Sequence, residues 1–138
     1  MLPGMDRKTE ILAHLPIFSK LDPRSAEAVA TLARVVSVPA GTVLVREGET
    51  AESFYVIVSG TVHVERAGQF LRSMTDGGFL GEIALVEGSE RTATVTCETD
   101  CELVELGSFE FGRVMARFPD VRARVEAAVA RRPHPGGR

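Results

Sequence analysis

One stretch, GGFLGEIALVEGSERTATV at residues 77–95, decides how this chain is interpreted. It begins with glycines, passes through an apolar segment at 83–86, and reaches Arg91 at the start of a β-branched run. Glu82 and Arg91 lie nine residues apart on either side of a second glycine turn. Taken alone, the pair fits a surface salt bridge, worth roughly 0–1 kcal/mol, as well as it fits a binding site. We expect the stretch to form the floor of a pocket for a small phosphorylated ligand.

Length and composition predict one ordinary globular domain. The chain has 138 residues, of which 44% are hydrophobic and 25% charged, as is usual for a protein with a single core. We expect one domain over residues 1–132 and a disordered Pro/Gly tail over 133–138. No apolar run approaches the ~20 residues needed to cross a bilayer, and the N-terminus lacks the features of a signal peptide. These observations predict a cytoplasmic location without membrane association.

Charge is distributed unevenly along the chain. Residues 35–112 carry four basic and thirteen acidic side chains, whereas residues 113–138 carry seven basic and two acidic ones. The acidic middle disfavours nucleic acid binding there, because phosphate backbones are bound by clustered Lys and Arg. Arg91 is the only cation between Arg72 and Arg113. An anion bound in this region must therefore be held at one point, by Arg91 and backbone amides.

The sequence offers little for metal or nucleophile chemistry. Cys97 and Cys101 have no His or Cys neighbours at ligand spacing, so we expect reduced, structural thiols and no zinc site or disulfide. The three histidines, His14, His63 and His134, lie in separate expected elements and do not form a metal-binding triad. No Ser/His/Asp or Cys/His arrangement is supported either. We therefore expect no metal, no cofactor and no enzymatic activity.

Hydrophobic periodicity predicts helices at both ends of the chain. Asp6 and Asp22, the latter followed by proline, are expected N-caps of helices over 6–15 and 22–34. Near the C-terminus, Ser108 is an expected N-cap, and Pro119 separates that helix from a last one over 121–132.

Between the helices, short β-branched runs alternate with glycine turns. Such a pattern predicts an antiparallel sandwich, barrel or jelly-roll-like β-roll, because nothing between the strands is long enough for parallel crossovers. Ser59-Gly60 is expected to be a tight hairpin turn. The expected strands are 35–38, 42–45, 54–59, 61–66, 69–74, 92–97 and 101–106.

The central stretch resembles the phosphate-binding cassette of the cyclic nucleotide-binding domain family. That family includes catabolite activator proteins, regulatory subunits of cAMP-dependent kinase and cyclic-nucleotide-gated channels. The resemblance covers roughly residues 10–130 and implies an antiparallel double-stranded β-helix with N-terminal helices and C-terminal hinge and lid helices. The segments that carry it are GEIAL at 81–85, ERTATV at 90–95, LPIF at 15–18, PAG at 39–41, EG at 47–48 and FYVIVSG at 54–60.

The resemblance also implies roles for individual residues of the cassette. Glu82 would accept a hydrogen bond from the ribose 2′-hydroxyl, and Arg91 would bind the exocyclic oxygens of the cyclic phosphate, two of which a planar guanidinium can contact at once. Amides at Ile83 and Ala84, at the start of a short helix, would complete the anion site. Small residues let a phosphate approach the backbone, which rationalises Gly81, Ala84 and Ala93.

The base needs apolar walls and a lid. The expected walls are Val62, Val64 and Leu71, on strands that face the cassette in this family. Thr92 is compatible with cGMP as a ligand, although a threonine is also common at the start of a strand. Of the two nucleotides, we favour cAMP. An arginine of the last helix could stack on the purine; the candidates are Arg122, Arg124, Arg131 and Arg132. Each of these side chains could instead belong to a basic face exposed to solvent.

The expected function is therefore that of a cyclic nucleotide sensor, in which Pro119 is a hinge and the last helix closes over the base. The alternative is a non-binding β-roll scaffold that acts on a protein partner. Expected partners are a cyclic nucleotide and an unidentified protein effector, and DNA binding by this chain alone is not expected. The apolar face of Val121, Val125 and Ala128 could serve lid closure or a homodimer.

Overall fold

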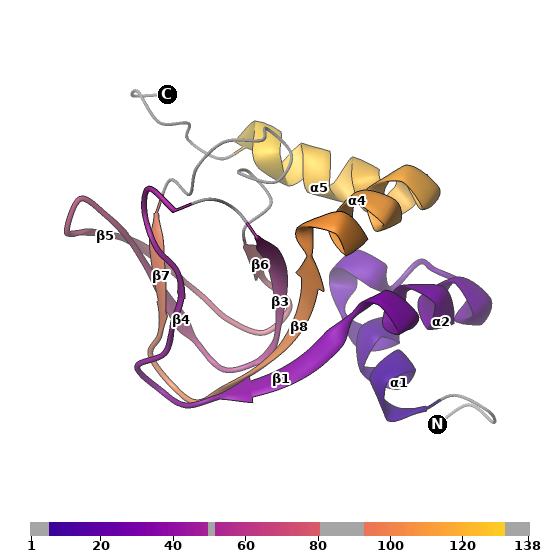
Figure 1. The fold of residues 1–138 in the computed structure, drawn as a ribbon, viewed down its shortest axis with the longest axis horizontal. Coiled ribbons are helices and arrows are strands. Elements are labelled where there is room, and N and C mark those ends of the chain that lie inside the picture. The colour runs from indigo at the N-terminus through magenta and orange to yellow at the C-terminus, as the bar shows by residue number, and fades with distance from the viewer. Residues whose placement is uncertain (1–5, 50–51, 81–92, 132–138) are drawn as a thin grey trace.

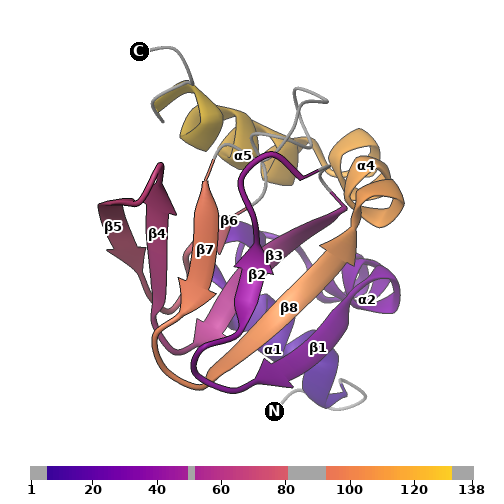
Figure 2. The same cartoon turned by 60° about the vertical axis from the view of Figure 1, so that its left-hand side comes forward.

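The computed structural model describes residues 6–49, 52–80 and 93–131. They form a layer of helices, a four-stranded antiparallel sheet against it, and a second four-stranded antiparallel sheet beyond (Figure 1). The first sheet contains, in order, β1 (Arg34–Val38), β8 (Cys101–Gly107), β3 (Ser53–Ser59) and β6 (Phe79–Leu80). The second contains β2 (Val43–Val45), β7 (Thr94–Cys97), β4 (Val62–Arg66) and β5 (Gln69–Met74), as Figure 2 shows.

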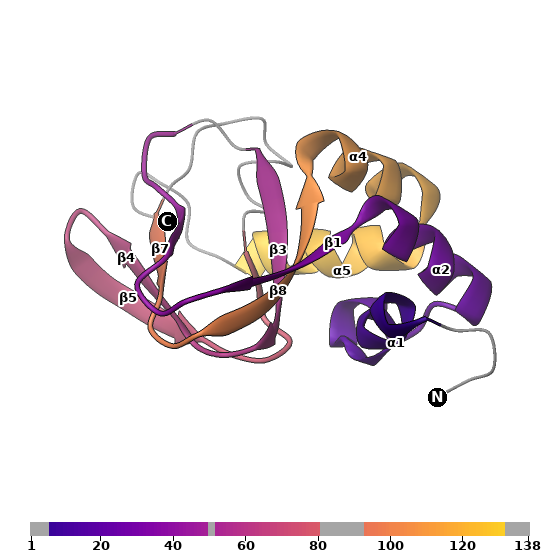
Figure 3. The ribbon, with the colours of Figure 1, turned by 60° about the horizontal axis from the view of Figure 1, so that its bottom comes forward.

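The predicted fold class, a β-roll with helices at both ends, is confirmed. The helices are α1 (Arg7–His14), the 3-10 turn η1 (Pro16–Phe18), α2 (Pro23–Leu32), α4 (Ser108–Arg117) and α5 (Pro119–Arg131). The N-terminal helices and α4 lie on the side of the first sheet that faces away from the second sheet, whereas the C-terminal end of α5 extends past β3 (Figure 3). Within the described residues, no helix is long and apolar enough to cross a bilayer. The predicted tail at 133–138 lies outside the described residues.

Local capping explains where the N-terminal helices begin. The Asp6 carboxylate accepts a hydrogen bond from Thr9 N at 2.7 Å, and the Asp22 carboxylate accepts one from Ser25 N at 2.7 Å. Each satisfies an amide that has no partner inside its helix. The predicted cap at Ser108 is wrong: Gly107 occupies the N-cap position, and Ser108 is the first helical residue, whose amide donates to the Glu52 carbonyl.

The predicted hairpin at Ser59-Gly60 is also wrong. β3 and β4 belong to different sheets, so this turn carries the chain from one sheet to the other. Gly60 has φ +111°, and a Cβ there would lie 2.6 Å from both the Asp100 carbonyl oxygen and Cys101 Sγ. Glycine is required at this corner for backbone conformation and for space. The true hairpin joins β4 to β5 through Ala67-Gly68, both of which have positive φ.

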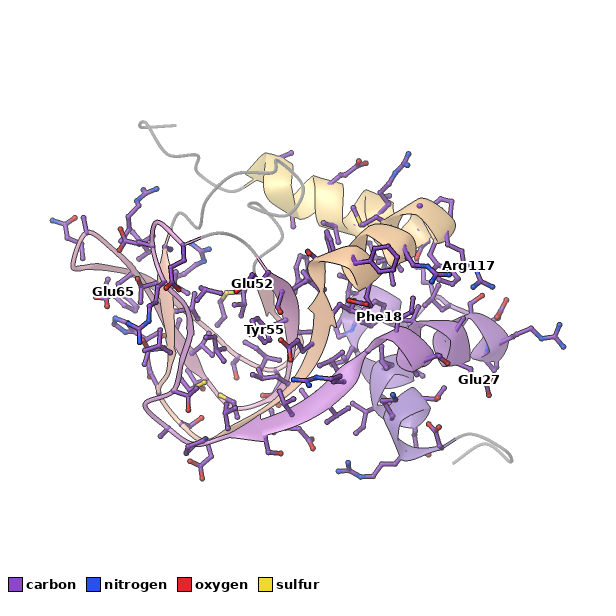
Figure 4. All side chains as sticks on the ribbon, in the orientation of Figure 1. Phe18, Glu27, Glu52, Tyr55, Glu65 and Arg117 are labelled. Atoms are coloured by element: carbon purple, nitrogen blue, oxygen red, sulfur yellow. The ribbon has the colours of Figure 1, made fainter. Side chains whose placement is uncertain are left out.

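Two hydrophobic cores lie on opposite faces of the first sheet. The helical core fills the space between that sheet and the helices, and Phe18 lies within it (Figure 4). It includes Phe54, whose ring centroid is 4.7 Å from that of Phe111 and 5.7 Å from that of Phe79. The roll core fills the space between the two sheets; its buried members are Val45, Ile57, Val62, Val64, Leu80, Val95, Cys97, Cys101 and Leu103.

The last helix is packed against the rest of the chain. Val121, Val125 and Ala128 are buried, and the first two belong to the helical core. The Arg124 guanidinium donates a hydrogen bond to the Pro16 carbonyl at 2.7 Å and lies 3.4 Å from the Asp120 carboxylate. The face predicted to be available for a homodimer is therefore occupied by the chain's own core.

Candidate functional site

The predicted phosphate-binding stretch connects the two sheets. Six of the predicted ligand-binding residues lie outside the described residues, and their roles stay predictions: Gly81, Glu82, Ile83, Ala84, Arg91 and Thr92. The residues on either side are described. Leu80 ends β6 in the first sheet with 3% of its surface exposed, and Ala93 immediately precedes β7 in the second. Both pack in the roll core, so the stretch begins on one sheet and ends on the other.

The inner wall of the second sheet is formed by alternate residues of its paired strands. Val62 lies opposite Cys97, and Val64 lies opposite Val95. Directly opposed residues of an antiparallel pair share a face, and Val62 and Val64 are 0% and 2% exposed in the roll core. The structure thus places both predicted wall residues on the inner face, together with Ala93, which packs against the same core.

The third predicted wall residue, Leu71, does not share this position. On β5, Met74 lies opposite Val62 and Arg72 lies opposite Val64, whereas the register shifts at Leu71. Leu71 is 40% exposed. Met74 packs against the roll core and Arg72 is half-buried. The inner face of β5 is therefore made by Arg72 and Met74, two residues that the sequence analysis did not select.

A bulge explains why Leu71 lies off the inner face. One extra residue in β5 separates the pair Val64–Arg72 from the pair Glu65–Phe70. Such an insertion moves every side chain beyond it to the opposite face relative to simple alternation. Counting back from Met74 by twos would have identified Arg72. The ring of Phe70, on the outer face, lies 4.9 Å from that of His63.

A polar recess of about 220 Å³ lies where β2 approaches the first sheet. Tyr55 lines it together with Glu52, both labelled in Figure 4, and with Glu105. Burial raises the pKa of Glu105, but hydrogen bonds from Ser53, Arg34 and Tyr55 outweigh that effect and hold it below its ordinary value. The Ser53 hydroxyl donates at 2.7 Å and the Arg34 guanidinium at 2.9 Å, so these bonds stabilise the ionised carboxylate of Glu105.

Comparison with known proteins assigns the family. The family description "Cyclic nucleotide-binding domain" matches residues 35–118, which include both inner strand faces and the stretch between Leu80 and Ala93. The chain belongs to the cyclic nucleotide-binding domain family. Members of this family are regulatory ligand-binding domains, and the resemblance stated from the sequence is confirmed.

Among curated proteins, the chain is similar to parts of much longer channels. Human potassium/sodium hyperpolarization-activated cyclic nucleotide-gated channel 3 is 35% identical over 116 residues, which are 84% of this chain but 15% of the channel. A cyclic nucleotide-gated potassium channel of Mesorhizobium japonicum is 32% identical over 115 residues, which are 83% of this chain and 32% of that protein. The chain thus spans a third or less of these relatives.

Solved structures show the same fold. The catabolite activator protein of Thermus thermophilus superposes with a TM-score of 0.75 at 26% identity, covering 84% of this chain and 57% of that one. The cAMP-bound structure of PfPKA-R superposes with a TM-score of 0.77 at 25% identity, covering 88% of this chain and 43% of that one.

In this cyclic nucleotide-binding domain, the arginines predicted to stack on the base differ in their surroundings. Arg124 is engaged with Pro16 and Asp120, on the side of α5 that faces η1. Arg122 is 55% exposed, with its guanidinium 3.8 Å from the Glu126 carboxylate one turn along the helix. The side chains of Arg131 and Arg132 lie outside the described residues. A role for either described arginine above a base stays a prediction.

Among the described residues, no three His, Cys, Asp or Glu side chains are grouped to hold a metal ion. In the described part of the chain, the second sheet offers a ligand an apolar inner wall, and β5 adds Arg72, which already takes part in an interaction. An apolar wall of this kind suits a flat apolar group such as a base.

Proposed function

We propose that this chain binds a cyclic purine nucleotide between the inner wall of the second sheet and the stretch at 81–92, and that binding repositions the C-terminal helices. The observation that carries the proposal is the family match over residues 35–118, which contains the Glu82 and Arg91 pair. In the proposed complex, Arg91 binds the cyclic phosphate, amides of Ile83 and Ala84 bind its remaining oxygens, and Glu82 accepts from the ribose hydroxyl.

The inner wall supplies the surface for the base. Val62 and Val64 provide an apolar face, which Met74 extends along β5. Arg72 lies opposite Val64; it already takes part in an interaction, and the five N–H donors of its guanidinium can serve more than one acceptor. A guanidinium of this kind pairs well with the O6 and N7 acceptors of guanine. We therefore propose that the pocket accepts cAMP and that Arg72, with the hydroxyl of Thr92, also admits cGMP.

A chain of aromatic contacts supports the coupling to the helices. Phe79, two residues before Gly81, packs on Phe54 of β3, and Phe54 packs on Phe111 of α4, with ring centroids 5.7 and 4.7 Å apart. Tightly packed cores respond to a local shift by repacking and not by gradual deformation. A ligand that pulls the stretch inward would therefore disturb α4 through these rings, and α5 follows α4 across Phe118.

Calorimetric titration with cAMP and cGMP tests the proposal. Arg91→Ala is expected to remove most of the binding, because a phosphate without its charge partner loses several kcal/mol of charge-assisted bonding. Arg24→Ala removes the same charge from the exposed face of α2 and is expected to bind like the unaltered chain. Absence of binding at millimolar nucleotide would leave the β-roll scaffold acting on a protein partner; unchanged binding by Arg91→Ala would refute the anchor.

The output of the sensor is a further proposal. The relatives that name a cyclic nucleotide are channels many times longer than the part matched here, so an effector protein is the proposed recipient of the signal. Pull-down experiments with and without nucleotide identify such an effector if its capture depends on the ligand.

A further inference from the structure

Cys97 and Cys101 bring two thiols together at the end of the roll opposite the predicted phosphate site. Cys97 ends β7 in the second sheet and Cys101 begins β8 in the first, and residues 98–100 turn the corner between them (Figure 2). Both thiols are free, and the residues are only 1% and 3% exposed. Both side chains point into the roll core, so the pair lies across the junction of the two sheets.

The two side chains are neighbours in the roll core. Burial first, and then a hydrogen bond and the charge interaction with Cys101, together raise the pKa of Cys97 to about 12. The Cys101 thiol donates weakly to two carbonyls, Thr99 O at 3.4 Å and Thr61 O at 3.7 Å. Since the thiolate is the reactive form, a thiol held neutral is a poor first nucleophile. Of the two residues, Cys101 is also the one that lines the recess described next, so chemistry at this pair begins at Cys101.

A shallow recess gives small molecules a route to that residue. It has a volume of about 420 Å³ and is lined by Ser37, Pro39, Ser59, Asp100 and Glu102 beside Cys101. This space admits a molecule of a few atoms. A thiol on another protein cannot reach sulfur atoms buried this deeply, so a reaction between the two neighbouring cysteines is favoured over one between chains.

We propose that Cys97 and Cys101 are a modification site, at which a small peroxide converts the two thiols into an intrachain disulfide that ties the two sheets together. The Cys101 sulfur attacks one oxygen of hydrogen peroxide and forms an S–O bond, while the O–O bond breaks. The departing hydroxide takes up the thiol proton and leaves as water, and Cys101 remains as a sulfenic acid. The Cys97 sulfur then attacks the Cys101 sulfur, the S–O bond breaks, and a second water carries away the Cys97 proton. The thiols lose two electrons, and the peroxide is reduced to two waters.

Oxidation would disturb few existing interactions. The Thr61 carbonyl keeps its hydrogen bond from Glu98 N at 2.9 Å after the Cys101 thiol loses its proton. Both sulfur atoms stay in the roll core. The new bond joins β7 directly to β8, and β7 is the strand that follows the predicted phosphate-binding stretch. The disulfide therefore constrains the strand on which that stretch ends.

The test is treatment of the folded chain with hydrogen peroxide, followed by intact mass, peptide mapping and thermal unfolding. The expected product has lost two hydrogen atoms, contains a Cys97–Cys101 disulfide, stays monomeric in non-reducing electrophoresis, unfolds at a higher temperature and reverts with dithiothreitol. Addition of oxygen to both cysteines without a disulfide, cross-linking between chains, or a disulfide formed only in urea would each overturn the proposal.

Single variants test the order of events. In Cys97→Ser, Cys101 is expected to accumulate sulfenic acid that dimedone traps, whereas in Cys101→Ser, Cys97 is expected to stay unmodified under the same treatment. Equal trapping at both positions would refute the assigned order. Circular dichroism checks that each variant is folded, and the alanine variants at the same positions replace any serine variant that is not, since alanine leaves no unpaired hydroxyl in the core.

Discussion

Replacing Arg72 with methionine is expected to weaken cGMP binding more than cAMP binding. The strand register places Arg72 opposite the buried Val64, on the inner face of the second sheet. Guanine presents two acceptors, O6 and N7, to a guanidinium, whereas adenine presents a donor and an acceptor at those positions. A bidentate pair of this kind discriminates by about 1–3 kcal/mol, so the Kd for cGMP should rise roughly 5- to 150-fold. The Kd for cAMP should change by much less.

The assay is titration calorimetry of both nucleotides against the unaltered chain, Arg72→Met and Leu71→Ala. Leu71→Ala is the matched control, because Leu71 is the neighbouring residue, lies at the register shift and is 40% exposed; its Kd values should be unchanged. Equal weakening of both nucleotides by Arg72→Met would place the guanidinium on the ribose phosphate and not on the base. Unchanged binding of both, or weakening by Leu71→Ala, would refute the assignment of the inner face.

Three further perturbations test other parts of the structure. Arg124→Gln removes the hydrogen bond to the Pro16 carbonyl, so amide hydrogen exchange in α5 should accelerate about 5-fold, for a loss of about 1 kcal/mol; unchanged exchange would show that this contact does not hold the helix. Glu105→Gln should lower the free energy of unfolding in urea by about 1 kcal/mol at pH 7. Because the folded-state pKa of Glu105 is below its ordinary value of 4.5, the difference should shrink as the pH falls through that lowered pKa; a pH-independent difference would contradict this. Asp22→Ala should destabilise α2 at neutral pH. Hydrogen bonds from Ser25 lower the pKa of Asp22 in the folded state below 3.8, so the difference between the two proteins should vanish as the pH falls through that lowered pKa; thermal unfolding followed by circular dichroism at several pH values measures it, and a difference that persists would contradict the cap.

Features that depend on neighbouring residues were predictable from the sequence. The caps at Asp6 and Asp22 form hydrogen bonds to amides three residues away, so the pattern that predicts them is contained in one turn of chain. Seven of the eight strands were predicted to within a residue or two for the same reason, because alternation and turn residues are local signals; β6 was not predicted. The family pattern within residues 81–95 extended this to the assignment of the family.

Features set by distant pairing were not predictable in the same way. Ser59-Gly60 has the composition of a hairpin turn, but β3 pairs with β8 and β6, and β4 pairs with β7 and β5. The two-residue strand β6 exists only because Phe79 and Leu80 pair with Val56 and Tyr55. Leu71 was selected from the strands that face the cassette in this family. A single bulge, which the alternation of side chains does not reveal, changes the face on which the residues beyond it lie.

The packing of α5 limits how the C-terminal helices can respond to a ligand. Swinging the whole helix over a base would expose Val121 and Val125, which are 1% and 0% exposed. Exposing a buried valine costs about 1.5–3 kcal/mol, so the two together require the ligand to bind the swung state roughly 10²- to 10⁴-fold more tightly than the observed one. Movement that begins beyond Ala128, or that carries α4 and α5 together, keeps these valines covered. A lid formed by the end of α5 is therefore energetically easier than one formed by the entire helix hinging at Pro119.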